Sequence, residues 1–184
     1  MSDVTVLLRR IAASDPRAID ELFGTLYAEM HRLAHGRLLQ SGPITLLDTT
    51  SLAHEAFLRL KNAGRIHLDS RVQFMAYVSK VLRAVIVDFV RKRSADKRGG
   101  HRVHVTLDTE VADEVGAADQ EIERVNDALL ELEETDPRLK QVVEMRFFGG
   151  LSEQEIGEIL GVSDRTVRSD WVRARLLLSV TLKR

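Results

Sequence analysis

Apolar residues recur at three- and four-residue intervals along most of the chain, the spacing that places them on one face of an α-helix. Ahead of the glycine pair at 99–100, this pattern predicts four helices. The first covers residues 4–11, and the second runs from 19 to about 39. The third begins within 48–51 and ends within 62–64, and the fourth runs from about 74 to 93. The polar stretch 65–73 is predicted to be a loop. No convincing alternation of apolar and polar residues, typical of a strand, occurs anywhere, so the sequence predicts an all-α fold.

The helical pattern is interrupted between Gly99 and Ala118, where Gly99-Gly100 precedes an acidic segment. Glycine and charged residues are typical of a linker. Helical spacing resumes at Ile122 and is broken once more at Asp136-Pro137. The chain is therefore predicted to form two small helical domains joined by a flexible acidic linker: residues 1–98, 99–119 (the linker) and 120–184.

The last third of the chain has the pattern of two short helices joined by a tight turn. Ser152 and Glu155 have the spacing of a capping box, in which two side chains satisfy backbone N–H groups at a helix start. Gly161 suits the left-handed conformation that ends a helix, and Ser163 is the next N-cap. The second helix then buries apolar residues at helical spacing: Val167, Trp171, Ala174 and Leu178.

The opposite face of this second helix is predicted to be exposed and partly basic. It carries Arg165, Ser169, Val172 and Leu176, with Arg168 and Arg173 on its flanks. A helix-turn-helix that presents arginines on its second helix is typical of proteins that read the DNA major groove. The alternative is a structural helical hairpin whose arginines form an ordinary solvated face.

The distribution of charge along the chain indicates where a binding partner would lie. The net charge is −1, from 27 basic and 28 acidic side chains, so the protein as a whole is not a basic nucleic-acid coat. However, residues 80–102 form a basic cluster, and residues 108–136 are acidic with Arg124 as their sole cation. This segregation favours a local anionic partner.

Two aromatic residues, Phe74 and Tyr77, lie just before the basic cluster. Aromatic rings beside cations suit single-stranded nucleic acid, because bases stack while the backbone is neutralised. Packing in the core is the alternative for both, and the preferred one for Phe74. The neighbouring loop Asp69–Gln73 offers short polar groups that can hydrogen-bond an extruded base.

Several other classes of function are disfavoured. The absence of cysteine excludes disulfides, thiolate metal sites and a cysteine nucleophile. His31 and His35 have a metal-chelating spacing but no third ligand nearby, so no metal or other cofactor is expected. No phosphate-binding glycine loop, nucleophile elbow or carboxylate dyad occurs, which argues against an enzyme. Neither a signal peptide nor a membrane-spanning apolar run is present, so a soluble cytoplasmic protein without a membrane partner is expected.

Together these features resemble a group IV (extracytoplasmic-function) RNA polymerase sigma factor of the sigma-70 family, over nearly the whole chain. Residues 51–60 are similar to the region 2.1 to 2.2 helix, which grips a coiled coil of the largest polymerase subunit. Residues 74–93 resemble region 2.3 to 2.4, which opens and reads the −10 promoter element. Residues 136–175 match region 4, most specifically in the run Arg146-Phe147-Phe148-Gly149-Gly150-Leu151-Ser152-Glu153-Gln154-Glu155-Ile156.

The resemblance implies core RNA polymerase and promoter DNA as partners and leaves an anti-sigma factor open as a third. Region 4 would contact the polymerase flap as well as the −35 element. Expected at the −35 element are Arg165, Arg168, Ser169, Val172 and Arg173. Expected at the −10 element are Asp69, Ser70, Arg71, Tyr77, Lys80, Arg83 and Arg91. Expected to contact core polymerase are Asp48, Leu52, His54, Glu55 and Phe57.

One departure from the family pattern precedes the gripping helix. The family shows an acidic string of the form Asp-x-Glu-Asp-Leu, whereas this chain has Asp48-Thr49-Thr50-Ser51-Leu52. Phosphorylating a hydroxyl would restore about −1.5 to −2 charge units at a helix N-terminus, where an anion is favoured. We therefore hypothesise that a Ser/Thr kinase activates the protein at Thr50, with Thr49 or Ser51 as substitutes. The alternative is that the hydroxyls are helix caps.

Two further classes are weighed against the sigma factor. A stand-alone helix-turn-helix transcription regulator would need a receiver or ligand-binding domain ahead of the motif, and the helical first half with its basic end argues against one. An enzyme with an accessory DNA-binding tail lacks a candidate catalytic site. The sequence accordingly predicts a factor without enzymatic activity that directs RNA polymerase to specific promoters.

Overall fold

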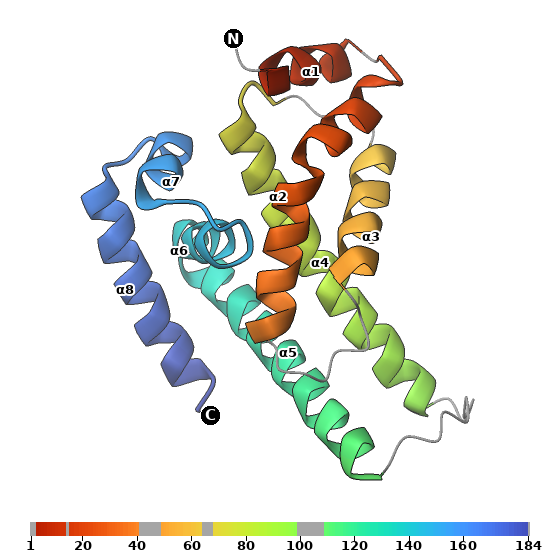
Figure 1. Ribbon diagram of the computed structural model, residues 1–184. Helices are drawn as coiled ribbons and strands as arrows, with labels where there is room; N and C mark the ends of the chain where they lie inside the picture. Colours follow the sequence, from red (N-terminus) through yellow and green to blue (C-terminus); the bar gives the residue numbers. More distant parts are fainter. Residues whose placement is uncertain (1–2, 14, 41–48, 64–67, 99–108, 184) are drawn as a thin grey trace.

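The computed structural model describes residues 3–13, 15–40, 49–63, 68–98 and 109–183, and every regular element among them is a helix (Figure 1). The all-α prediction is confirmed. Asp48 and residues 99–108 of the expected linker lie outside the described part of the chain. The first half contains α1 (Asp3–Ala12), α2 (Ala18–Gln40), α3 (Thr49–Asn62) and α4 (Arg71–Arg98). The second half contains α5 (Thr109–Thr135), α6 (Pro137–Val143), the π-helix η1 (Glu144–Phe148), α7 (Glu153–Leu160) and α8 (Asp164–Thr181).

Helices α2, α3 and α4 pack side by side, and α1 lies across one end of α2 (Figure 1). Their facing sides bury large apolar residues, among them Leu22, Met30, Leu52, Phe74 and Leu82. Burying one such side chain contributes about 1.5–3 kcal/mol, so this stripe holds the first half together. The position of Phe74 agrees with core packing rather than with a base-stacking role.

The start of α4 differs from the predicted loop over residues 65–73. Helix α4 begins at Arg71, so Arg71 to Gln73 form its first turn. The backbone N–H of Gln73 donates to Ser70 Oγ at 3.2 Å, and Gln73 Oε1 accepts from the Asp69 N–H at 2.8 Å. This is close to the reciprocal arrangement of a capping box, a signal present in Ser70-Arg71-Val72-Gln73 that the polarity of the stretch obscured.

The start of α5 is a second difference. Helical structure was not expected before Ala118, yet α5 runs from Thr109. In the sequence, Val111, Val115 and Ala118 have a helical spacing that continues to Ile122, but the acidic residues and Gly116 of the segment obscured it. Arg93 of α4 also makes an ion pair with the buried Asp119 near the middle of this helix. The expected linker is therefore helical over residues 109–119.

Helices α6, α7 and α5 all contact α8, which forms one side of the second half (Figure 1). The predicted break at Asp136-Pro137 is observed, because Asp136 ends α5 and caps α6 by accepting from the N–H of Arg138 at 3.1 Å. Proline at the first helical position costs no backbone hydrogen bond. The sequence thus turns the chain sharply between α5 and α6.

The two halves are packed together in the described residues. Their buried apolar side chains form one continuous core, and α4 contacts α5, η1 and α7 as well as α3. Helix α4 therefore forms the side of the first half that meets the second half (Figure 1). The division into two domains remains a prediction, and the arrangement seen is the one in which they touch.

The turn between α7 and α8 generates a stability prediction. A Cβ on Gly157 would lie 2.7 Å from the carbonyl oxygen of Val162, closer than backbone and side chain can approach. We expect Gly157→Ala to lower the free energy of unfolding by about 1–3 kcal/mol, the usual cost of overpacking. Urea unfolding followed by circular dichroism measures it. Gly24→Ala on α2 is the control, because a Cβ there meets nothing within 4 Å and should stabilise the protein by about 0.5–1 kcal/mol. Equal effects of both substitutions would contradict the packing argument.

Candidate nucleic-acid interface

The helix pair α7–α8 is built by the local signals expected from the sequence. Ser152 Oγ accepts from the Glu155 N–H at 3.2 Å, and Glu155 accepts from the Ser152 N–H at 2.9 Å, which completes a capping box. Gly161 has a φ of 67°, the left-handed conformation that favours glycine. Ser163 then caps α8 by accepting from the Thr166 N–H at 3.1 Å. The turn between α7 and α8 is therefore only three residues long, and backbone N–H groups at both helix starts have hydrogen-bond acceptors.

Helix α8 presents the face expected to be exposed. Arg165, Ser169 and Arg173 are exposed, as is Val172 with 62 % of its surface accessible. Its other side buries Val167 and Ala174 completely. The five residues expected at the −35 element are therefore all on the outside of α8, where a duplex can reach them.

The inner side of α8 is held by an ion pair that the sequence did not reveal. Asp170 is only 3 % exposed and accepts from Arg138 Nε at 2.8 Å and from its Nη2 at 3.3 Å. Two hydrogen bonds from one guanidinium fix both distance and orientation. This contact ties α8 to α6, so the exposed face is held on a rigid support.

A second group of charges sits beside the exposed face. Glu153, at the start of α7, accepts from Arg168 Nε at 3.0 Å and Nη2 at 2.9 Å, and from Arg146 Nη1 at 2.7 Å. The guanidinium of Arg146 lies over the Trp171 ring, 4.8 Å from its centroid. The hydrogen bonds from Arg146 and then Arg168 lower the pKa of Glu153, and Glu153 raises the pKa of Arg168.

Neither Glu153 nor Arg146 was expected to have a role. An acidic residue in the first turn of a helix is common, because the helix dipole stabilises a negative charge there. Its pairing with an arginine on the next helix depends on the angle between α7 and α8, which no local pattern encodes.

The residues expected at the −10 element do not form one free surface. Lys80 is exposed and Tyr77 half-buried, whereas Arg83 faces the second half of the chain. Arg83 Nε lies 2.8 Å from Oε1 of the buried Glu144 without a hydrogen-bonding angle, and its Nη1 donates to Asn126 at 2.6 Å. Arg91 lies 3.8 Å from Asp127. The acidic second half thus neutralises part of the basic face of α4.

The start of α4 shows the same pairing. Arg71 makes ion pairs with Glu29 on α2 and, at 3.7 Å, with Glu155 on α7. Asp69 is exposed and Ser70 partly so, and both take part in the cap of α4. This end of the helix therefore touches both halves.

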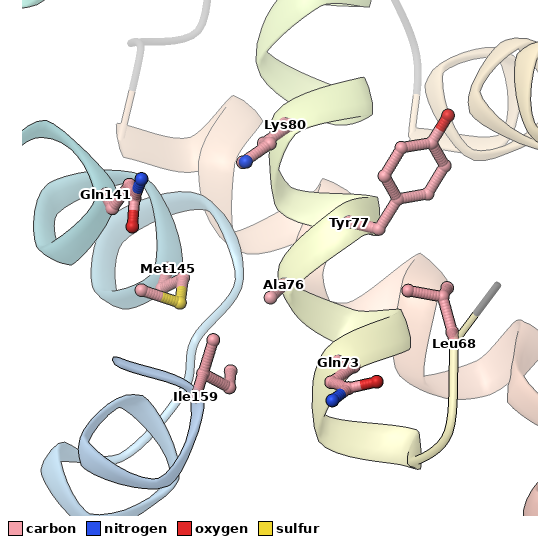
Figure 2. Close-up of a pocket in the computed structure, with 8 residues that line it drawn as sticks. All are labelled: Leu68, Gln73, Ala76, Tyr77, Lys80, Gln141, Met145 and Ile159. Atoms are coloured by element: carbon pink, nitrogen blue, oxygen red, sulfur yellow. The ribbon is translucent and has the colours of Figure 1, made fainter. Parts of the chain in front are cut away.

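A cavity of about 220 Å³ lies where the halves meet (Figure 2). Lys80 and Ala76 on α4 face Gln141, Met145 and Ile159 of the second half, while the Tyr77 ring points to the other side of α4 (Figure 2). The lining of this cavity is largely apolar, and no pair of acidic or basic groups that suggests catalysis occurs among its residues. It marks the plane along which the halves are apposed.

Helix α3 carries the residues expected to contact polymerase. His54 and Glu55 are exposed, and Phe57 is half-buried, stacked on Phe23 with ring centroids 4.1 Å apart. Leu52 is fully buried, so it supports the helix from beneath instead of lying on its surface. Thr50 is exposed in the first turn of α3, between the half-buried Thr49 and the exposed Ser51.

Within the part of the chain that the structure describes, no group of three or more His, Asp or Glu side chains is arranged to hold a metal ion. None of the helices described there combines the length and apolar character needed to cross a membrane.

The regular elements of the described residues are all helices, and a capped helix pair whose second helix exposes arginines is typical of DNA-binding proteins. A family model described as ECF sigma factor matches residues 1–184, which is the whole chain, so the chain belongs to the ECF sigma factor family. A comparison with curated proteins found no match. Membership makes the protein a transcription initiation factor that directs RNA polymerase to promoters, with core polymerase and promoter DNA as its partners.

Proposed function

We propose that this sigma factor reads the −35 element with α8, reads the −10 element with the basic part of α4 and grips core polymerase with α3. The observation that carries the proposal is the outer face of α8. That face exposes Arg165, Ser169 and Val172, with Arg168 and Arg173 on its flanks. The inner side of the helix is held to α6 by Asp170. Such a helix fits the major groove, where base edges present distinct patterns of donors and acceptors.

Individual residues of α8 would act in different ways. An arginine reads guanine through O6 and N7, and serine hydrogen-bonds to several bases. The exposed Val172 provides an apolar group that can meet a thymine methyl. Arginines at the edge of the groove bind phosphate, which gives affinity without sequence preference. The cytoplasm, where polymerase transcribes, is the place of action that fits this role, and an anti-sigma factor remains a candidate partner.

Transcription from purified core polymerase tests the function. The full chain added to core enzyme should yield run-off transcripts from its promoters. Arg168→Ala should weaken −35 recognition by about 1–3 kcal/mol if Arg168 makes a bidentate base contact. A set of promoters that differ in the −35 element separates a base contact from a phosphate contact, because loss of a phosphate contact weakens all of them alike.

The alternative, a stand-alone helix-turn-helix regulator, is distinguished in the same assay. Such a regulator would bind duplex DNA but would not allow core polymerase to initiate. If neither the unmodified nor the phosphorylated full chain allows core polymerase to initiate, the sigma-factor proposal is overturned.

We also propose that the halves of the chain separate when the factor binds polymerase. The support is the pairing of Arg83 and Arg91, both expected at the −10 element, with Glu144 and Asp127. While the pair with Glu144 persists, Arg83 is only 15 % exposed and is not available to nucleic acid, whereas the charge of the exposed Arg91 is partly offset by Asp127. Residues 1–98 and 120–184 would move apart as two domains, with residues 99–119 between them.

Distance measurement tests the separation. The chain contains no cysteine, so fluorescent labels attach specifically to cysteines introduced at two exposed sites, Ala28 on α2 and Ser179 on α8. We expect a short label distance in the free protein and a longer one after core polymerase binds. Glu144→Gln, which removes the buried negative charge, should lengthen the distance in the free protein. An unchanged distance in the polymerase complex would contradict the proposal.

The third part of the proposal concerns regulation of the polymerase contact. Thr50 is exposed in the first turn of α3, five residues before Glu55 on the helix expected to grip polymerase. A phosphate there would be favoured by the helix N-terminus and would supply the negative charge that the family pattern has at this place. A Ser/Thr kinase acting on Thr50, or on Thr49 or Ser51 in its place, would then strengthen binding to core polymerase.

Pull-down of core polymerase tests this switch. Phosphorylated protein and Thr50→Glu should bind core enzyme more tightly than the unmodified chain, and Thr50→Ala should bind no better after treatment with kinase. Thr25→Glu is the matched control, because Thr25 is an exposed threonine on α2. Equal binding by unmodified and phosphorylated protein would exclude the switch.

A further inference from the structure

Glu153 is a carboxylate placed beside the face that the protein would turn toward DNA. It lies at the first position of α7, and its side chain is 24 % exposed. A negative charge beside a DNA-binding face would oppose binding, since affinity for DNA depends on neutralising phosphates. A carboxylate at this position is therefore expected to have a role that offsets this cost.

The hydrogen bonds of Glu153 indicate such a role. A single oxygen, Oε2, accepts from both Nε and Nη2 of Arg168, at 3.0 and 2.9 Å. A guanidinium has five N–H donors in one plane, so this contact leaves the end of the Arg168 guanidinium, formed by Nη1 and Nη2, to bind something else. Two parallel donors remain there, one N–H of Nη1 and the second N–H of Nη2, which is the arrangement that pairs with O6 and N7 of guanine. Asp164 Oδ2 lies 3.9 Å from Nη2, beyond hydrogen-bonding distance.

Glu153 is itself fixed from the opposite side. Its other oxygen, Oε1, accepts from Arg146 Nη1 at 2.7 Å, and the Arg146 guanidinium lies over Trp171. Trp171 is on α8, three residues beyond Arg168. Arg168, Glu153, Arg146 and Trp171 thus form a chain of contacts that begins and ends on α8 and passes through η1.

We propose that Glu153 is a positioning residue that holds Arg168 in the orientation for reading guanine in the −35 element. This inference rests on the proposed role of α8 in −35 recognition. An arginine side chain loses substantial rotamer freedom when it binds, and an arginine held in place beforehand loses less. The carboxylate also offsets the charge of Arg168, which reduces its attraction to phosphates of any sequence.

A selection experiment with the polymerase holoenzyme tests the proposal. A pool of promoter fragments randomised across the −35 element is bound by core polymerase carrying the full-length factor, and the bound fragments are sequenced. The position that loses its guanine preference in Arg168→Ala is the one that Arg168 reads. We expect Glu153→Ala to lower the enrichment of guanine at that same position by about tenfold, within the range for one bidentate contact. Enrichment at the other positions should be unchanged.

Matched variants separate positioning from a general effect of charge or folding. Glu158→Ala removes the same charge from an exposed site on α7 and should leave the base preference intact. Glu153→Gln keeps an acceptor oxygen and should retain more of the preference than Glu153→Ala. In the Arg168→Ala background, Glu153→Ala should have no further effect. A partly misfolded variant would bind less DNA overall without changing the preference at one position.

The selection experiment distinguishes failure of the positioning role from failure of the proposed function. If Arg168→Ala abolishes the guanine preference but Glu153→Ala leaves it intact, the positioning role is overturned while the proposed function stands. If Arg168→Ala changes no base preference, the role of Arg168 in promoter reading is overturned and the inference falls with it. As a second readout, Glu153→Ala should bind unrelated duplex DNA more tightly than the wild type at equal salt, and weaker binding would contradict the charge argument.

Discussion

The central constraint on this structure is that α4 packs against both halves of the chain. One side of the helix completes the core of α2 and α3, and the other meets α5, η1 and α7. The second contact includes a buried ion pair between Arg83 and Glu144, and breaking one member of such a pair typically costs about 3–5 kcal/mol. A helix rich in cations is thereby held against the acidic half of the same chain. Whatever binds the basic groups of α4 must compete with these internal partners.

The same chemistry recurs at the outer face of α8, with a different outcome. There the acidic partner, Glu153, binds one edge of Arg168 and leaves the side chain 62 % exposed. Exposed ion pairs contribute little to stability, so this contact matters for geometry more than for folding. The chain thus pairs arginines with acids in two ways: buried pairs withdraw cations from solvent, and surface pairs hold them in place.

Much of the fold follows from local sequence signals. The capping box at Ser152, the left-handed Gly161 and the break at Asp136-Pro137 all act within a few residues of where they are written, and all are observed as predicted. The early start of α5 was missed because acidic residues and Gly116 resemble a linker and obscured the helical spacing of Val111, Val115 and Ala118. The pairs Arg138–Asp170 and Arg83–Glu144 join residues far apart in the chain, and nothing local distinguishes them from solvated charges. The exposed residues of α8 were predictable from periodicity, whereas the acid that orients one of them was not.

The π-helix η1 connects these two kinds of pairing. Residues two apart on a helix point to nearly opposite sides, and in η1 these are Glu144, which meets α4, and Arg146, which meets Glu153 and Trp171. Short π-helices are rare and frequently occur at functional sites. One turn of backbone therefore connects the contact between the halves to the charges beside α8. If the halves separate as proposed, any movement of this turn would displace Glu144 and Arg146 together, and with Arg146 the carboxylate that binds Arg168.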